Sequence, residues 1–246
     1  MPIIQCDAKG LEVYCGAYLS QDKILMQELW DGLDIHGINQ REVLNLGSHE
    51  AGRLIAKIFL FRLMYGGSAY SYAHDSDFMG VSTSEKYWQK IIDAFYEKYK
   101  GFRDWHTKIL QEATRQGYLI MPTGRRYNFK LKRNFRGELE APQTLIKNYP
   151  VQGLGADIMS IARVSFKRRF DAEKVEGLVV NTIHDSIGCD VPSEELDHVA
   201  GLFHAVFDDL PSNFQRVFGV EFNLPLRCEV KVGPNMMEME EYKKAA

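Results

Sequence analysis

Residues 53–66 read RLIAKIFLFRLMYG, and the interpretation of the whole sequence starts from this stretch. Arg53, Lys57, Phe61 and Tyr65 recur every four residues, so in a helix of 3.6 residues per turn they lie on one face with a slow drift around the axis. Two cations lie toward the positive N-terminal end of the helix, and two aromatic rings follow. This face suits an elongated ligand with phosphates at one end and a flat ring at the other, such as a nucleoside triphosphate. The alternative is a surface helix with solvated cations and buried rings.

Two carboxylates stand at the ends of predicted strands on either side of this helix in the sequence. Asp7 ends a predicted strand at residues 2–7, and Asp185 stands in a tight turn between predicted strands 178–183 and 187–191. An Asp at a hairpin tip is open to a hard metal ion, although an Asp in a turn is commonly a plain turn residue. Two carboxylates from separate strands can share two Mg²⁺ ions about 3.5–4 Å apart, and without metal they would repel each other.

A basic stretch at residues 124–136 has the composition of a nucleic-acid contact. It contains no acid, and its aromatic residues Tyr127, Phe129 and Phe135 alternate with cations. Cations with interleaved aromatic rings are typical of surfaces that contact a polynucleotide backbone. A solvated charged hairpin is the alternative. The cations are Arg125, Arg126, Lys130, Lys132, Arg133 and Arg136.

Two amides, Asn148 and Gln152, lie four residues apart around Pro150. Amides can donate hydrogen bonds to the minor-groove acceptors, which are similarly placed in every base pair. Such contacts would test base-pair geometry without reading the sequence. Buried structural amides are the alternative reading.

The composition is that of a folded chain with no obvious membrane or disulfide character. The 246 residues include 30 Lys and Arg against 33 Asp and Glu, a net charge of -3, and 45% of the residues are hydrophobic. A histone-like polycation is therefore excluded, but a local basic surface is not. No apolar run reaches the roughly 20 residues that a bilayer requires. The four cysteines form no C-x-x-C pair, so we expect reduced thiols in the cytoplasm, or in the host cytoplasm if the protein is viral.

The pattern of apolar residues and breakers predicts an α+β fold with a small sheet and many helices. Ser82 and Glu85 predict a capping box before one of the helices. Pro150 is predicted to mark the start of another. The predicted helices cover 48–64, 83–100, 102–116, 151–170 and 193–209, and a final strand covers 226–232.

Together, in their order along the chain, these residues resemble the motifs of family A DNA polymerases. Residues 7–12, DAKGLE, are similar to motif A, the spaced helix of residues 53–66 to motif B, and His184-Asp185-Ser186 to motif C. In having Ser186 directly after Asp185, the chain is similar to bacteriophage and mitochondrial members. The resemblance implies a right-hand polymerase fragment with fingers helices inserted in a small antiparallel palm sheet. The implied domains are 1–34 for the start of the palm, 35–140 for the fingers, and 141–246 for the palm with motif C.

The resemblance also implies roles for the matched positions, with primer-template DNA and dNTPs as partners and two Mg²⁺ ions as cofactor. Asp7, Asp185 and the Ala8 carbonyl would bind the metals. His36, Arg53 and Lys57 would hold the triphosphate, and Lys57 could protonate the pyrophosphate. Phe61 and Tyr65 would receive the base and sugar, with Glu12 over the sugar. The implied DNA contacts are Arg125, Arg126, Asn148, Gln152 and His184.

Some positions depart from the family pattern. Thr144 stands where many bacterial members carry an Arg near the template, and Ala8-Lys9 replaces a Tyr-Ser pair. Motif A begins six residues from the N-terminus, so we expect the thumb to be absent and a second polypeptide to supply thumb and upstream palm, with or without an exonuclease. The alternatives are a non-catalytic nucleic-acid-binding remnant and a single-subunit RNA polymerase relative. Glu12 with Phe61 disfavours the RNA polymerase.

Overall fold

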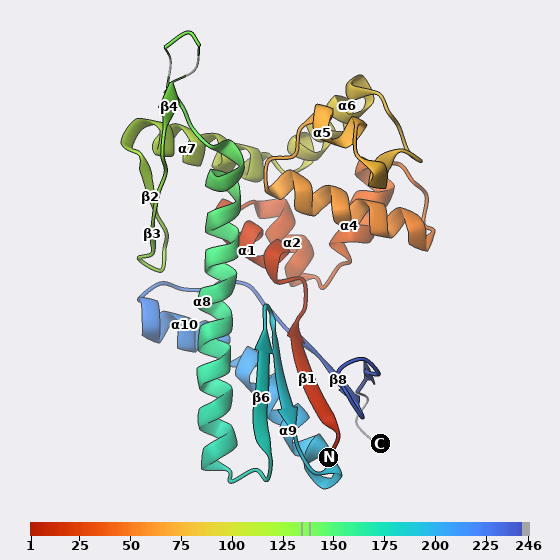
Figure 1. Ribbon diagram of the computed structural model, residues 1–246, viewed down its shortest axis with the longest axis vertical. Helices are drawn as coiled ribbons and strands as arrows, with labels where there is room; N and C mark the ends of the chain where they lie inside the picture. The colour runs from red at the N-terminus through yellow and green to blue at the C-terminus, as the bar shows by residue number, and fades with distance from the viewer. Residues whose placement is uncertain (134, 138, 243–246) are drawn as a thin grey trace. The chain divides into compact units, whose positions relative to one another are not determined.

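The computed structural model describes residues 1–133, 135–137 and 139–242. The chain divides into two compact units. We call Met1–Val13 with Gly153–Ala246 the sheet unit, and Tyr14–Gln152 the helical unit. The helices and antiparallel strands of both units confirm the predicted α+β class (Figure 1).

The sheet unit is built on an antiparallel sheet in the order β6-β7-β1-β8-β9 (Figure 1). Strand β1 lies in the middle, and its Asp7 is opposite Ser186 of β7 on one side and Glu229 of β8 on the other. The predicted strands are confirmed to within two residues at each end. The strands are β1 (Ile3–Ala8), β6 (Leu178–Ile183), β7 (Ser186–Asp190), β8 (Cys228–Gly233) and β9 (Glu240–Glu241).

Strict alternation along β1 gives the sheet a buried face and an accessible face. Ile4, Cys6 and Ala8 are at most 1% exposed, whereas the residues between them are partly exposed. Successive side chains of a strand point to opposite faces, and α9 (Leu196–Asp208) packs against β1 and β8. Asp7 is therefore on the accessible face.

Two of the predicted helices in the second half of the chain differ from the prediction, and the first of them, α8, has residues in both units. Helix α8 (Gln143–Ala172) begins well before Pro150, which lies inside it rather than at its start. Proline removes one backbone donor, and this helix accommodates that loss. The predicted helix 193–209 is a short 3-10 turn (Ser193–Glu195) followed by α9, and a separate helix α10 (Leu210–Phe218) has its proline in the first turn. Phe166 of α8 stacks on Phe203 of α9 at 4.2 Å.

The helical unit has an aromatic core. Phe59, Tyr72, Trp88 and Phe95 are fully buried, and Phe59 contacts each of the other three rings. Aromatic pairs at these spacings add stabilisation beyond the buried area alone. The helices are α1 (Leu11–Ser20, which begins in the sheet unit), α2 (Lys23–Trp30), α3 (Ile35–Ile38), the π-helical turn η1 (Asn39–Val43), α4 (Glu50–Met64), α5 (Ala69–Ala73), the 3-10 turn η2 (Ser76–Phe78), α6 (Glu85–Lys98) and α7 (Lys100–Gln116).

The predicted capping box of Ser82 and Glu85 is wrong, because Ser84 is the N-cap of α6 and its hydroxyl accepts from the Tyr87 N–H. Ser82 instead accepts from the Ser84 N–H. The helix predicted at 102–116 is confirmed and ends at Gly117, whose φ of 78° is left-handed. Beyond it lie two hairpins, β2 (Tyr118–Ile120) with β3 (Arg126–Asn128), and β4 (Lys132–Arg133) with β5 (Leu139–Glu140).

Across the described residues, no helix combines the length and apolar character that crossing a bilayer would need.

Candidate active site

In the sheet unit, a backbone hydrogen bond joins the two predicted metal-binding segments. Asp7 is the next-to-last residue of the central strand β1, and Asp185 lies in the turn between β6 and β7. The Ala8 N–H donates to the Asp185 carbonyl at 2.9 Å. The structure thus brings together Asp7, Ala8 and Asp185, which are about 180 positions apart in the sequence, through strand pairing that fixes both backbones.

The turn that carries Asp185 has a strained backbone. His184 adopts a φ of 50°, in the left-handed region that few residues other than glycine occupy. The Ser186 hydroxyl donates to the Ile183 carbonyl at 2.9 Å and closes the turn. Non-glycine residues persist in such conformations where the surrounding structure holds them, often at functional sites. The turn presents His184 as an exposed side chain beside Asp185.

Asp7 lies among more negative than positive side chains. Burial, followed by the negative charge of Asp185, raises the pKa of Asp7 to about 6. Lys231 opposes the shift, whereas Glu229 and Glu12 add to it. A raised carboxyl pKa next to a like charge means that the ionised pair is costly unless a cation joins it. The site therefore has a deficit of positive charge.

The residues fit a magnesium site of the kind that uses few protein ligands. Within the described ranges, no group of three or more His, Cys, Asp or Glu side chains forms a metal cage. Mg²⁺ is usually bound by one or two carboxylates together with waters and substrate phosphates. The charge deficit at Asp7 and Asp185 is the observation that fits such ions. A structural zinc site, which needs four closed ligands, does not fit.

In the helical unit, α4 presents its predicted face to solvent. Its N-terminus is capped by the His49 ring, whose Nδ1 accepts from the Gly52 N–H at 2.9 Å. Arg53 and Lys57 are exposed, while Phe61 and Tyr65 are half-buried. The surface-helix alternative requires both rings to be buried, and neither ring is fully buried.

Arg53 is held by Asp34 in a two-pronged ion pair. Its Nε donates to Oδ2 at 2.8 Å and its Nη2 donates to Oδ1 at 2.9 Å. The hydrogen bonds from Arg53 lower the pKa of Asp34. Gly37 leaves room for this carboxylate, since a Cβ atom there would lie 2.6 Å from Asp34 Oδ2. This geometry orients the guanidinium before any ligand binds.

His36 and Lys57 both lie near Phe61. The His36 ring meets the Phe61 ring edge-on at 5.6 Å, and Lys57 Nζ is 5.7 Å from the centroid of Phe61. Burial, followed by the positive charge of Arg53, lowers the pKa of His36 to about 4. His36 is therefore neutral at pH 7, and it would hold a phosphate by hydrogen bonding rather than by charge. The Nδ1 atom of His36 is buried without a hydrogen-bond partner among the described residues.

The π-helical turn η1 fixes the segment of Asp34 and His36 to α4. Gln40 Nε2 donates to the His49 carbonyl at 2.7 Å. Asn39 Nδ2 donates to the Ile35 carbonyl at 2.9 Å. Short π-helical turns are frequent at functional sites because they redirect side chains.

The two candidate amides of α8, Asn148 and Gln152, differ in exposure. Gln152 is exposed and its Nε2 donates to the Tyr65 hydroxyl at 2.5 Å. Asn148 is half-buried, one turn earlier. The buried-amide alternative therefore does not hold for Gln152, which lies next to the aromatic end of the α4 face.

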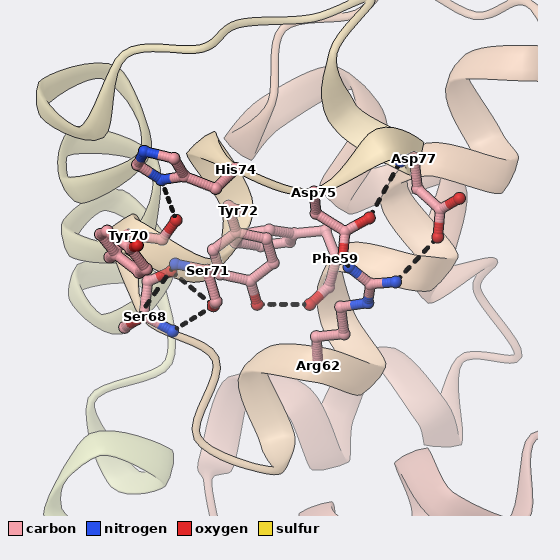
Figure 2. Close-up of polar contacts among 9 residues, drawn as sticks. All are labelled: Phe59, Arg62, Ser68, Tyr70, Ser71, Tyr72, His74, Asp75 and Asp77. Atoms are coloured by element: carbon pink, nitrogen blue, oxygen red, sulfur yellow. Dashed lines mark hydrogen bonds and ion pairs between the residues drawn. The ribbon is translucent and has the colours of Figure 1, made fainter.

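Polar contacts anchor the segment after Tyr65 to α4 (Figure 2). The Tyr72 hydroxyl donates to the Phe59 carbonyl at 2.9 Å, and Arg62 pairs with both Asp75 and Asp77. Ser68 and Ser71 form a reciprocal capping box at the start of α5. The segment from Ser68 to Asp77 is therefore held to α4 by side chains from both elements.

The basic stretch forms hairpins in which some aromatic rings are structural. Arg126 stacks on Tyr118 with its Cζ 3.8 Å from the ring centroid, and Arg125 is exposed. Phe129 is buried and packs with Tyr127 around Tyr149 of α8. The exposed cations are consistent with a phosphate contact, but these two rings serve packing. Phe135 is 92% exposed, and Asn134 of this stretch lies outside the described residues.

Sequence reasoning missed the direct partner of Arg53. Asp34 belongs to the segment Asp34-Ile35-His36, where only His36 received a role. Its pairing with Arg53 joins residues that are 19 positions apart and has no local signal. An acid two positions before a candidate phosphate ligand was the available hint.

Comparisons with known proteins agree with this architecture. The family model described as DNA polymerase family A matches residues 1–238. The chain belongs to DNA polymerase family A. It is 28% identical over 240 residues to DNA polymerase I of Deinococcus radiodurans, covering 96% of this chain and 23% of that one. It is 26% identical over 243 residues to the thermostable DNA polymerase I of Thermus aquaticus, covering 97% and 27%.

The fold is also similar to a solved structure described as the POL domain of Pol1 from M. smegmatis in complex with DNA primer-template and dNTP. The TM-score is 0.78 at 21% sequence identity, over 96% of this chain and 40% of that one. This likeness confirms that the fold is that of part of a polymerase domain. The chain spans about a quarter of the length of the two curated relatives.

Proposed function

We propose that this chain carries the catalytic residues for template-directed DNA synthesis, transferring a nucleotide from a dNTP to a primer 3′-hydroxyl. The observation that carries the proposal is the carboxylate pair Asp7 and Asp185, joined by the Ala8–Asp185 hydrogen bond and short of positive charge. In this proposal the sheet unit acts as the palm and the helical unit as the fingers. Because the chain spans about a quarter of its relatives, the activity is proposed for the whole protein to which these residues belong.

In the proposed mechanism, Asp7, Asp185 and the Ala8 carbonyl would hold two Mg²⁺ ions. When bound, these ions would supply charge neutralisation for in-line phosphoryl transfer. Arg53, Lys57 and neutral His36 bind the triphosphate. Lys57 also gives a proton to the pyrophosphate as it leaves.

The remaining residues position the two substrates. Phe61 and Tyr65 contact the base and sugar of the nucleotide, and Glu12 stands against the sugar 2′ position. Asn148, Gln152 and His184 contact the minor groove at the primer end, and Arg125 and Arg126 bind the DNA backbone. Positioning and electrostatic stabilisation supply most of the rate in phosphoryl transfer, so the proposal needs no covalent intermediate.

The test is primer extension with Mg²⁺ by the wild-type protein and by Asp7→Asn and Asp185→Asn. Asp190→Asn is the matched control, because Asp190 is on the same sheet at the other end of β7. Extension that is lost in the first two variants and kept in the control supports the proposal. DNA binding without extension by the wild type would favour a non-catalytic binder, and a preference for ribonucleotides would favour an RNA polymerase relative.

A second polypeptide that supplies thumb and upstream palm, the bacteriophage-like character and the cytoplasmic location stay predictions. The assay is therefore run with and without an adjacently encoded polypeptide. Robust processive synthesis by the 246-residue chain alone would contradict the need for a partner.

A further inference from the structure

Lys147, near the start of α8, lies against Gly66, the residue that follows Tyr65. A Cβ atom on Gly66 would lie 3.2 Å from Lys147 Cδ and 3.8 Å from Lys147 Nζ. Gly66 has a φ of 92°, so both its conformation and its lack of a side chain suit it to this contact. The lysine stem thus covers the turn at the aromatic end of the α4 face.

Lys147 is half-buried, and its side chain forms no ion pair with a carboxylate among the described residues. Burial lowers the pKa of Lys147, and its positive charge contributes to lowering the pKa of His106, another potential cation. Lys98 of the same unit provides the contrast, since its partly buried ammonium pairs with Glu28 at 2.9 Å and Glu42 at 2.5 Å. A half-buried cation without a counter-charge is costly unless an anion binds to it.

This cation is at the wrong end of α4 to serve the triphosphate. Lys57 and Gly66 are separated by a rise of about 14 Å at 1.5 Å per residue. Under the proposed function, Arg53 and Lys57 hold the phosphates and Phe61 and Tyr65 hold the base. An anion at Lys147 therefore belongs to a different molecule, on the base side of the nucleotide. The strand that supplies the pairing base is the polyanion expected on that side.

We propose that Lys147 binds a backbone phosphate of the template strand next to the templating nucleotide. The inference rests on the proposed function and adds to it a positioning residue for the template. Gln152 of the same helix donates to the Tyr65 hydroxyl, so α8 would contact both the nucleotide pocket and the template. A purely structural role is the competing explanation, because a cation at the C-terminal end of α4 also complements the helix dipole.

The experiment measures the affinity of the full chain for a primer-template by fluorescence anisotropy, over a range of salt concentrations and without dNTP. Lys147→Met keeps the apolar stem and removes the charge. Affinity is expected to fall about tenfold at 0.15 M salt, and the slope of log K against log salt is expected to decrease by about 0.7–0.9. Lys147→Arg should retain both values. Lys90→Met, an exposed lysine of α6, is the matched control and should leave both unchanged.

Neutral methylphosphonate linkages locate the phosphate. Placed one at a time along the template, one linkage near the templating base should weaken the wild type and leave Lys147→Met unaffected. Equal sensitivity of both proteins at every template position would overturn the proposal. So would an unchanged salt slope with a lowered Tm, which indicates a structural role, or a loss confined to the KM for dNTP.

Failure of this inference and failure of the proposed function are distinguishable. The binding arms need no catalysis, and primer extension by the wild type is recorded separately. Wild-type extension with an unchanged Lys147→Met salt slope contradicts only the role of Lys147. A changed slope with no extension in any condition contradicts the polymerase activity and leaves the phosphate contact standing.

Discussion

The candidate site residues of the two units differ in how their charges are compensated. In the sheet unit, Asp7 and Asp185 are like charges, and the pKa of Asp7 is raised to about 6. In the helical unit, Arg53 is already paired with Asp34, whose pKa is lowered. The carboxylate pair therefore has an excess of negative charge, whereas the guanidinium of Arg53 is already oriented and partly neutralised by Asp34. We therefore expect divalent ions to affect the function of Asp7 and Asp185 most. For Arg53 and Lys57, we expect the orientation of the side chains to matter most.

The architecture explains this difference. Strand pairing fixes Asp7 and Asp185 through the backbone, so two carboxylates can be held together despite their repulsion. Helix α4 fixes only the spacing of Arg53 and Lys57, and the direction of the long guanidinium side chain depends on a partner from another segment. Four predictions test the comparison, from the largest expected effect to the smallest.

Asp7→Asn and Asp185→Asn should each abolish nucleotide addition, by at least about a thousandfold, because removing a negative ligand disables a site built around divalent cations. The fold should persist with an equal or higher Tm, since one of two repelling charges is gone. Single-nucleotide incorporation and thermal unfolding measure the two effects. Near-normal incorporation by both variants would show that the charge deficit has no catalytic meaning.

Lys57→Ala should reduce kcat by about a hundredfold with little change in KM for dNTP. A cation near the leaving group acts on charge that develops in the transition state. Arg53→Ala should raise KM as well, because Arg53 is oriented by Asp34 in the ground state. Steady-state kinetics with a single added nucleotide compare the variants. Equal losses confined to KM would remove the distinction between these two cations.

Glu12→Ala should increase ribonucleotide insertion relative to deoxyribonucleotide insertion, by about tenfold in the ratio of kcat/KM values. A side chain against the sugar discriminates by repulsion, so its removal makes room for a 2′-hydroxyl. Glu12→Gln keeps the size without the charge and is the matched control. An unchanged ratio in Glu12→Ala would indicate that Glu12 matters mainly through its charge on Asp7.

Lowering the pH should change the free energy of unfolding through two opposing contributions, one from histidines of the helical unit and one from Asp7 of the sheet unit. Near neutral pH the histidines should contribute nothing. Burial lowers the pKa of His36 to about 4 and that of His106 to about 3. Above pH 6.5 both are neutral in the folded and unfolded states. Below pH 6.5 these histidines bind protons in the unfolded chain but stay neutral in the folded chain. The free energy of unfolding therefore falls by up to about 1.4 kcal/mol per pH unit for each histidine.

The contribution of Asp7 to the pH dependence of stability has the opposite sign. Its folded pKa of about 6 lies above the ordinary 3.8, so the folded state binds a proton first and gains stability as pH falls between these values. Denaturant unfolding from pH 7 to pH 4 measures both contributions. His106→Asn should flatten the loss of stability, and Asp7→Asn should make the net loss steeper. Parallel pH profiles for the two variants would contradict the assignment.

Local patterns predicted most of the elements well. The 3.6-residue spacing found α4, α6 and α7, and alternation with turn residues found β6 and β7. Pro150 was misread because proline is tolerated inside a long helix when tertiary packing outweighs one missing backbone hydrogen bond. The capping-box prediction failed because only Ser82 has a Glu three residues later, yet Ser84 is the residue that caps the helix. The Ser82 carbonyl instead accepts a hydrogen bond from the indole N–H of the buried Trp88.

The sequence by itself determined which chemical groups are present and which of them share a helix face or a strand end. The face shared by Arg53 and Lys57 followed from the helix period, which is a local property of the backbone. The order of these residues between Asp7 and Asp185 carried the resemblance to the family's motifs. Only the tertiary structure decided the partners of those groups: Asp34 for Arg53, the Asp185 carbonyl for the Ala8 N–H, and Gly66 for Lys147. The physical reason is that charge balance and burial depend on contacts between distant segments, which no local pattern encodes.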